Sequence, residues 1–168
     1  GAAPRTSEVD RRRFVVGAAL AAALAGCRTA RSGSAGSGGS ATGERIPYGD
    51  APRQHLLLSL PDGAPGPLPV VVLVHGGFWS SAFRADLMDP LAADVLAGGR
   101  HAVVNVEYRS LGDDGGGWPG TLADVAAAID HLPALDAALD LDAVTVVGHS
   151  AGGQLAAWLA GRSRLPAD

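Results

Sequence analysis

The stretch VVGHSAGGQLAAWLA, residues 146–160, places a serine between an apolar strand-like run and an apolar helix-like run. Ser150 stands between Gly148 and Gly152. A sharp strand-to-helix turn brings together the positions two before and two after its central residue, and a Cβ at either position would clash. Two glycines remove that clash, so the pattern predicts a tight turn that lifts the Ser150 hydroxyl clear of the strand end.

The segments upstream of this turn alternate between strand and helix patterns. Strands are predicted at residues 54–60, 70–74, 102–108 and 143–147, and helices at residues 83–98, 121–132 and 154–159. The run at residues 70–74 is apolar throughout, as in a strand that is buried on both faces. Such alternation predicts parallel strands joined by right-handed crossovers. We therefore expect the α/β class, with a mostly parallel sheet and flanking helices.

The composition argues against several classes of partner. The 168 residues carry 13 basic and 17 acidic side chains, a formal net charge of −4. This balance leaves no basic footprint for nucleic acid. The single cysteine cannot form an internal disulfide, and no Cys/His cluster has the spacing of metal ligands. We expect no nucleic-acid partner, no metal and no cofactor.

The first 27 residues have the pattern of a bacterial export signal. Arg11, Arg12 and Arg13 precede an apolar run at residues 14–26, and Cys27 follows the run. A run of this length is short for a bilayer span but fits the apolar core of a signal peptide. The letters LAGC that end at Cys27 resemble a lipobox, and the paired arginines resemble a twin-arginine signal, with Sec export as the other route. We expect Cys27 to be lipidated and to anchor the exported protein to a membrane of the bacterial cell envelope.

The remaining sequence divides into two parts. Residues 28–44 are rich in Gly and Ser and nearly free of large apolar side chains, which is typical of a flexible tether. Residues 45–168 carry all the strand and helix patterns and are predicted to form the globular domain. The tether would hold this domain away from the membrane surface.

A second glycine turn, HGGFW at residues 75–79, directly follows the predicted strand at residues 70–74. Paired glycines at this place let backbone amides turn inward toward the neighbouring strand end. Reactive groups gather at the carboxyl ends of parallel strands, so this loop and Ser150 are predicted to meet. The amide of Ala151 and the positive end of the helix after it would face an anion formed beside Ser150.

Together these two motifs resemble the α/β-hydrolase fold family, and within it the esterase and arylformamidase-like members that carry an HGG-x-W loop. The resemblance covers residues 48–166 and includes VNVEYR at 104–109 and WPGTLADV at 118–125. It implies that Ser150 is the nucleophile. It also implies that the amides of Gly77, Phe78 and Ala151 form the oxyanion hole.

The resemblance assigns supporting roles to four further residues. His75 and Gly76 would brace the oxyanion loop, with His75 in a structural role and not as the base. Gly148 and Gly152 would shape the turn around Ser150.

The activity that the resemblance implies is serine hydrolysis. Ser150 would attack a carboxylic ester, or an N-formyl or aryl amide, and form an acyl-enzyme that water then hydrolyses. Trp79 and Trp118 would either wall an acyl or aryl pocket or pack in the core. Two alternatives stay open: a lipid-anchored binding protein that keeps the fold without the catalysis, and a peptidase of the same fold.

The catalytic acid and histidine are not expected in this chain. In the fold family both follow the serine in chain order. No histidine follows Ser150, and the one acid after it is Asp168. We therefore interpret the chain as the N-terminal portion of a longer hydrolase, truncated after the helix that follows the serine. The 168 residues alone are expected to be inactive, and their last strand is expected to be an exposed sheet edge.

The other charged residues near the strand ends are given structural interpretations. Glu107 and Arg109 could line the site, but a structural ion pair is the favoured interpretation. Asp113 and Asp114 are predicted to lie in a solvated loop, because no further acids follow at calcium-loop spacing. Asp124 is expected on a helix face with a local partner.

Overall fold

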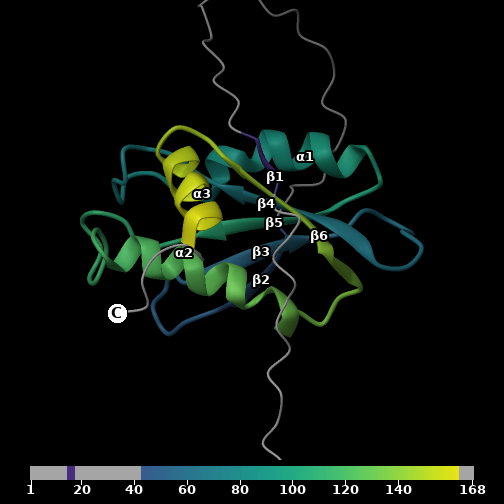
Figure 1. Cartoon of the computed structure of the whole chain (residues 1–168), viewed down its shortest axis with the longest axis horizontal. Helices are drawn as coiled ribbons and strands as arrows, with labels where there is room; N and C mark the ends of the chain where they lie inside the picture. Colours follow the sequence, from purple (N-terminus) through teal and green to yellow (C-terminus); the bar gives the residue numbers. More distant parts are fainter. Residues whose placement is uncertain (1–14, 18–42, 163–168) are drawn as a thin grey trace, which may run out of the picture.

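The computed structural model describes residues 15–17 and 43–162, and these form one six-stranded sheet with helices on both faces (Figure 1). The strand order across the sheet is β1-β6-β4-β5-β3-β2. In chain order the elements are β1 (Val15–Gly17), β2 (Glu44–Pro47), β3 (His55–Ser59), β4 (Leu68–Val74), η1 (Ala85–Met88), α1 (Asp89–Ala97), β5 (Ala102–Glu107), α2 (Gly120–Asp130), η2 (Leu132–Ala134), β6 (Leu139–Gly148) and α3 (Ala151–Gly161).

The sheet is mixed, and its central part is parallel. β4 pairs in parallel with both β5 and β6, while β3 pairs antiparallel with β5 and β2 pairs antiparallel with β3. The α/β class and the mostly parallel sheet predicted from the sequence are therefore confirmed. The two antiparallel strands form one edge, away from the strands that carry the two glycine motifs.

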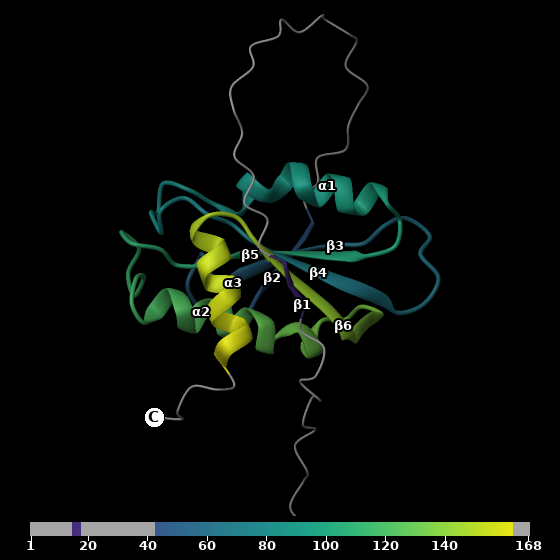
Figure 2. The same cartoon turned by 45° about the horizontal axis from the view of Figure 1, so that its top comes forward.

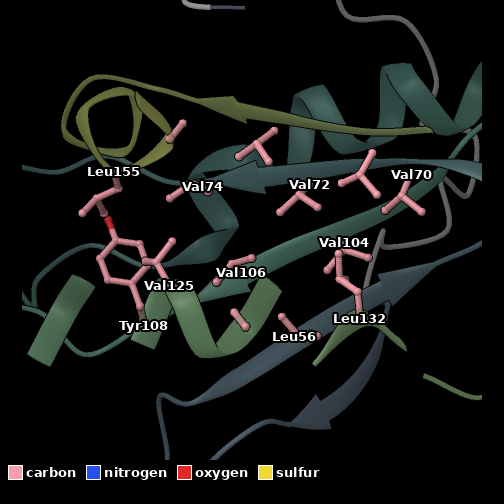
Figure 3. Close-up of a cluster of buried hydrophobic side chains, with 14 of the residues drawn as sticks. Leu56, Val70, Val72, Val74, Val104, Val106, Tyr108, Val125, Leu132 and Leu155 are labelled. Atoms are coloured by element: carbon pink, nitrogen blue, oxygen red, sulfur yellow. The ribbon is translucent and has the colours of Figure 1, made fainter. Parts of the chain in front are cut away.

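Alternate residues of the central strands belong to two separate apolar clusters, one on each face of the sheet. Val72 of β4 and Val104 of β5 belong to the cluster on the side that is covered by α2 and α3, which also contains Leu155 (Figure 3). Leu73 and Val103, their neighbours in sequence, belong to the other cluster, which packs against α1. Figure 2 shows α1 on one face of the sheet and α2 and α3 on the other. Burial on both faces explains why β4 and β5 are almost continuously apolar.

The register of the parallel strands brings their carboxyl ends to one edge. Val74, the last residue of β4, pairs with Gly148, the last residue of β6, and also with Val106 of β5. The segments that leave these three strands therefore begin side by side. These are the segments in which the sequence analysis placed the site.

Several elements differ from the sequence expectations. β2 has no counterpart among the predicted strands, and the single helix predicted at residues 83–98 is a 3₁₀ turn followed by α1. The break has a local cause, because Pro90 lies in the first turn of α1 and lacks the N–H that a continuous helix needs there. α3 begins three residues earlier than expected, directly after Ser150.

The edge next to β6 also differs from expectation. The strand before Ser150 was predicted to be an exposed edge, but β1 pairs with three of its residues, Thr145, Val146 and Val147. β1 comes from the segment predicted to be a signal peptide. The rest of that segment, the tether up to residue 42, and Cys27 lie outside the described residues. Within the part of the chain that is described, no helix is long and apolar enough to cross a membrane.

The two-sided core makes a first prediction about stability. Leu56 of β3 is fully buried, and its replacement in Leu56→Ala should lower the free energy of unfolding by about 2–5 kcal/mol, since transfer and cavity terms add. The matched change Leu60→Ala removes a side chain that is 48% exposed, and it should change the free energy of unfolding by less than about 0.5 kcal/mol. Urea unfolding of the full-length protein measures both. Equal losses in the two variants would contradict the assignment of the core.

Candidate active site

Ser150 stands on a strained turn between β6 and α3. Its backbone has φ 52° and ψ −118°, and it is the N-cap residue of α3. Positive φ is costly for a residue with a Cβ, and it holds here because hydrogen bonds fix both sides of the turn. The amide of His149 donates to the carbonyl of Val74 at 3.1 Å, and the amide of Gly153 donates to the carbonyl of Ser150 at 2.9 Å. The Ser150 side chain lies at the surface.

Two glycines allow the chain to pass closely on either side of Ser150. A Cβ at Gly148 would lie against the carbonyl of Gly152, and a Cβ at Gly152 would lie against the carbonyls of Val74 and His75. These contacts are with backbone atoms, which cannot rotate away. The first turn of α3 is thus packed directly on the end of β4.

The HGGFW loop lies next to this turn. A Cβ at Gly76 would come within 3.0 Å of the Cβ of Ser150. Gly77 has φ 111°, and the Phe83 ring fills the space where its side chain would be. Phe78 and Trp79 have φ 55° and 54°, and with Ser150 they are the non-glycine residues of positive φ in the described chain. All of the strained non-glycine backbone found there lies at these two segments.

Three backbone amides at this place are available to a ligand. Within residues 43–162, the amides of Gly77, Phe78 and Ala151 take part in no hydrogen bond, and neither does the Ser150 hydroxyl. Unpaired amides beside a hydroxyl at a helix N-terminus are the arrangement that receives an oxyanion. The structure places the HGGFW loop beside the Ser150 turn, and the role of these amides stays a prediction.

His75 is part of the support beneath the loop. Its ring is stacked on Tyr108 with 4.2 Å between centroids, and its Nδ1 donates to the carbonyl of Gly76 at 2.8 Å. The Tyr108 hydroxyl donates to the carbonyl of His75 at 2.7 Å. Burial raises the pKa of Tyr108 above its ordinary value, so this hydroxyl remains a donor. These contacts agree with a bracing role for His75.

Glu107 and Arg53 form a buried ion pair behind the same loop. Arg53 NH1 lies 3.1 Å from Glu107 Oε1, and the two side chains are 7% and 3% exposed. Burial by itself raises the pKa of Glu107, but His75, the amide of Ala85 and Arg53 together outweigh it and hold the pKa below its ordinary value. The sequence analysis missed Arg53, because a partner 54 positions away leaves no local pattern.

Arg109 pairs with Asp124 and not with Glu107. Arg109 NH2 lies 2.7 Å from Asp124 Oδ1, and the Arg109 amide donates to Asp124 Oδ2 at 3.0 Å. The expectation of a helix-face Asp124 with a local partner is wrong, because this carboxylate is buried and its partner precedes it by 15 residues. Asp113 is likewise not a freely solvated loop residue. It binds Arg53 Nε at 3.3 Å and the amide of Ser110 at 2.8 Å.

Three aromatic side chains of the HGGFW and WPGTLADV motifs are exposed. Phe78 is 78% exposed and Trp118 is 82% exposed, which excludes core packing for Trp118 within the described chain. Trp79 is partly covered, and its carbonyl accepts a hydrogen bond from the amide of Leu111 at 2.6 Å.

The Ser150 hydroxyl has no hydrogen-bonded base among the described residues. No histidine in residues 43–162 hydrogen bonds to its hydroxyl, and His55 lies instead 3.0 Å from the carbonyl of Pro52. The described chain also contains no group of three or more side chains placed to hold a metal ion.

The close approach at Gly152 makes a second prediction. In Gly152→Ala the new methyl group would meet two strand carbonyls, so we expect a loss of about 1–3 kcal/mol in the free energy of unfolding. Gly161→Ala changes the other end of the same helix, where a Cβ meets nothing within 4 Å, and should leave stability unchanged or raise it by up to about 1 kcal/mol. Thermal and urea unfolding of the full-length protein compare them. Similar effects at both positions would argue against the packed turn.

The lowered pKa of Glu107 makes a third prediction. A carboxyl group whose pKa is lower in the folded than in the unfolded protein stabilises the fold at pH values above the unfolded pKa of 4.5. This stabilisation is lost as the pH falls through the pKa of the folded state. The free energy of unfolding should therefore decrease as the pH falls below 4.5, and Glu107→Gln should flatten part of this decrease. Urea unfolding at a series of pH values tests it. Parallel curves for the two proteins would show that Glu107 keeps an ordinary pKa.

Comparisons with known proteins identify the family. The BD-FAE family model matches residues 56–165, which include both glycine motifs. The Arabidopsis thaliana protein named probable isoprenylcysteine alpha-carbonyl methylesterase ICMEL1 is 32% identical over 116 residues, or 67% of this chain and 23% of its own. Carboxylesterase NlhH of Mycobacterium tuberculosis is 36% identical over 99 residues, or 58% of this chain and 30% of its own.

Solved structures agree with this match. The structure of a bacterial heroin esterase superposes with a TM-score of 0.56 and 33% identity, over 66% of this chain and 35% of its own. This chain spans less than a third of the length of either curated relative. The matched residues carry β4, β5, β6 and nearly all of β3, together with the HGGFW loop and the Ser150 turn. The chain belongs to the BD-FAE family of α/β-hydrolase-like proteins.

Proposed function

We propose that this protein hydrolyses carboxylic esters with Ser150 as its nucleophile. The observation that carries the proposal is the exposed serine on a positive-φ turn, with Gly76 packed against it and three unpaired amides in the two adjoining segments. The relatives are named as a carboxylesterase, a methylesterase and a heroin esterase, which favours esters over amides.

The proposed reaction has two steps. Ser150 Oγ attacks the carbonyl carbon of the ester while a general base takes the hydroxyl proton. The carbonyl oxygen becomes an oxyanion that accepts hydrogen bonds from the amides of Gly77, Phe78 and Ala151. The tetrahedral intermediate collapses to an acyl-enzyme, and the protonated base gives its proton to the departing alcohol. Water, activated by the same base, releases the acid and restores the serine.

The fixed amides are the main contribution of the described residues to this reaction. Each is held by a backbone that cannot relax, because Gly152 is packed on β4 and Phe83 fills the space behind Gly77. Donors held in place for the developing charge stabilise the transition state more than the ground state. N-formyl and aryl amides present the same carbonyl to the same amides and are proposed as secondary substrates.

Covalent labelling tests the nucleophile. A fluorophosphonate probe should label the full-length protein at Ser150. Its phosphorus takes the place of the ester carbonyl carbon, and its P=O oxygen takes the place of the carbonyl oxygen at the amides of Gly77, Phe78 and Ala151. Ser150→Ala should abolish labelling and hydrolysis of p-nitrophenyl acetate. Ser59→Ala, at the opposite end of the sheet, should keep both. Peptide mapping by mass spectrometry locates the adduct.

The outcomes distinguish the rival functions. A folded, full-length sample that resists labelling would contradict the proposal and favour a binding protein of the same fold. Labelling with hydrolysis of a peptide substrate but not of p-nitrophenyl acetate would favour a peptidase. Hydrolysis of formanilide at a rate above that of the ester would favour the amide reaction.

A further inference from the structure

The segment from His75 to Ala85 contains the proposed oxyanion loop, and one buried carboxylate touches both of its ends. Glu107 Oε1 lies 3.7 Å from His75 Nε2, at the start of the segment. Glu107 Oε2 accepts a hydrogen bond of 2.8 Å from the amide of Ala85, at its end. Asn105, two residues earlier on β5, donates to the carbonyl of Ala85 at 2.8 Å. Two side chains of β5 thus bind the amide and the carbonyl of Ala85, at the end of the segment.

Arg53 fixes the middle of the same segment. Its NH2 donates to the carbonyl of Ser81 at 2.7 Å and to that of Phe83 at 3.3 Å. The Phe83 ring packs against Gly77, one of the proposed oxyanion donors. Arg53 also pairs with Glu107. The guanidinium that binds the middle of the segment therefore neutralises the carboxylate that lies at its two ends.

The start of the segment is fixed through His75. Its Nδ1 donates to the carbonyl of Gly76, so the opposite edge of the ring, with Nε2, faces Glu107. The ring cannot turn away, since it is stacked on Tyr108 and is 1% exposed. His75 Nε2 and Glu107 Oε1 lie 3.7 Å apart without a hydrogen bond, so the carboxylate meets the start of the segment by close packing, next to Gly76, which lies against Ser150.

General stability is a poor explanation for this pair. A buried ion pair is weak evidence for stability, because desolvation offsets most of its attraction and a well-packed apolar pair would serve as well. The Arg109–Asp124 pair shows the contrast. It joins the segment after β5 to α2 and makes no hydrogen bond or ion pair with residues 75–85. The polar contacts of the Glu107 side chain, apart from Arg53, are all with the two ends of that segment.

We propose that Glu107 is a positioning residue for the oxyanion loop and that Arg53 is its obligatory partner. Their contacts hold the amides of Gly77 and Phe78 in the geometry that receives the oxyanion. This inference rests on the proposed ester hydrolysis, and it assigns to Glu107 no contact with substrate.

Positioning of this kind has a characteristic kinetic signature. Donors that act on the oxyanion lower the transition-state energy, and loss of one donor typically costs about 10²–10³-fold in kcat. A loosened loop keeps its donors but misplaces them, so we expect Glu107→Gln to lower kcat by about 10-fold or more. KM should change by less than about 3-fold, because the ground state does not use these donors.

The test uses the full-length protein with p-nitrophenyl acetate. Glu107→Gln is compared with Asp124→Asn, which also neutralises a buried carboxylate that binds an arginine and a backbone amide. Circular dichroism fixes a temperature at which every variant is fully folded. We expect a fall in kcat for Glu107→Gln, and for Asp124→Asn a loss of stability with kcat unchanged.

Each outcome bears on the proposal. Unchanged kcat in folded Glu107→Gln, or an equal fall in Asp124→Asn, would overturn it. If Glu107→Gln does not fold, Arg53→Lys decides, since lysine keeps the charge beside Glu107 but lacks the planar guanidinium fork that also reaches the carbonyls of Ser81 and Phe83. A fall in its kcat supports the proposal and an unchanged kcat overturns it. Wild-type protein without activity or labelling would refute the proposed function itself, so the two failures are distinguishable.

Discussion

The contact on which the site depends is the direct approach of the α3 backbone to the end of β4. Gly152 lies against the carbonyls of Val74 and His75 with no room for a Cβ. This approach fixes the distance between the Ser150 turn and the HGGFW loop, because the loop begins at His75. It also fixes the direction of α3, whose Leu155 is buried in the core with Val72 and Val74. Packing of one helix turn thus decides where two separate motifs meet.

The second constraint is electrical. β5 is buried along its whole length, yet it carries Asn105 and Glu107 on the side that faces residues 75–85. A buried carboxylate is costly unless it is paired and hydrogen bonded. Arg53 and the amide of Ala85 meet both conditions, and Arg53 reaches Glu107 from the chain that precedes β3. The antiparallel edge of the sheet therefore contributes to the site through Arg53, whose side chain reaches Glu107 and the loop.

Much of the fold could be predicted from local sequence, and the exceptions have physical reasons. Five apolar residues in a row at 70–74 predict a strand with both faces covered, and the structure confirms it. β2 was missed because it is a short edge strand with one half-buried residue, so it has no periodicity to detect. The break before Asp89 was missed because apolar spacing continues through it, although Pro90 was a visible signal.

For the site, backbone geometry was more predictable than charge. The glycines at positions 148 and 152 indicate a close approach of the chain, since only glycine fits there. No such signal joins Arg53 to Glu107, or Arg109 to Asp124. These pairs depend on which strand lies beside which, and that order follows from the packing of the whole sheet. Side-chain networks between distant segments require the fold before they can be recognised.

The strain at the site shows how strongly the fold holds it. Ser150, Phe78 and Trp79 each adopt a positive φ, at a cost of about 1–3 kcal/mol apiece. Their sum is a sizeable fraction of the roughly 5–15 kcal/mol that stabilises a typical domain. Hydrogen bonds on both sides hold the loop residues, from Ser80 to the Gly77 carbonyl and from Leu111 to the Trp79 carbonyl. Since no local preference favours these conformations, the positions of the amides around Ser150 are set by the surrounding sheet and its buried charges.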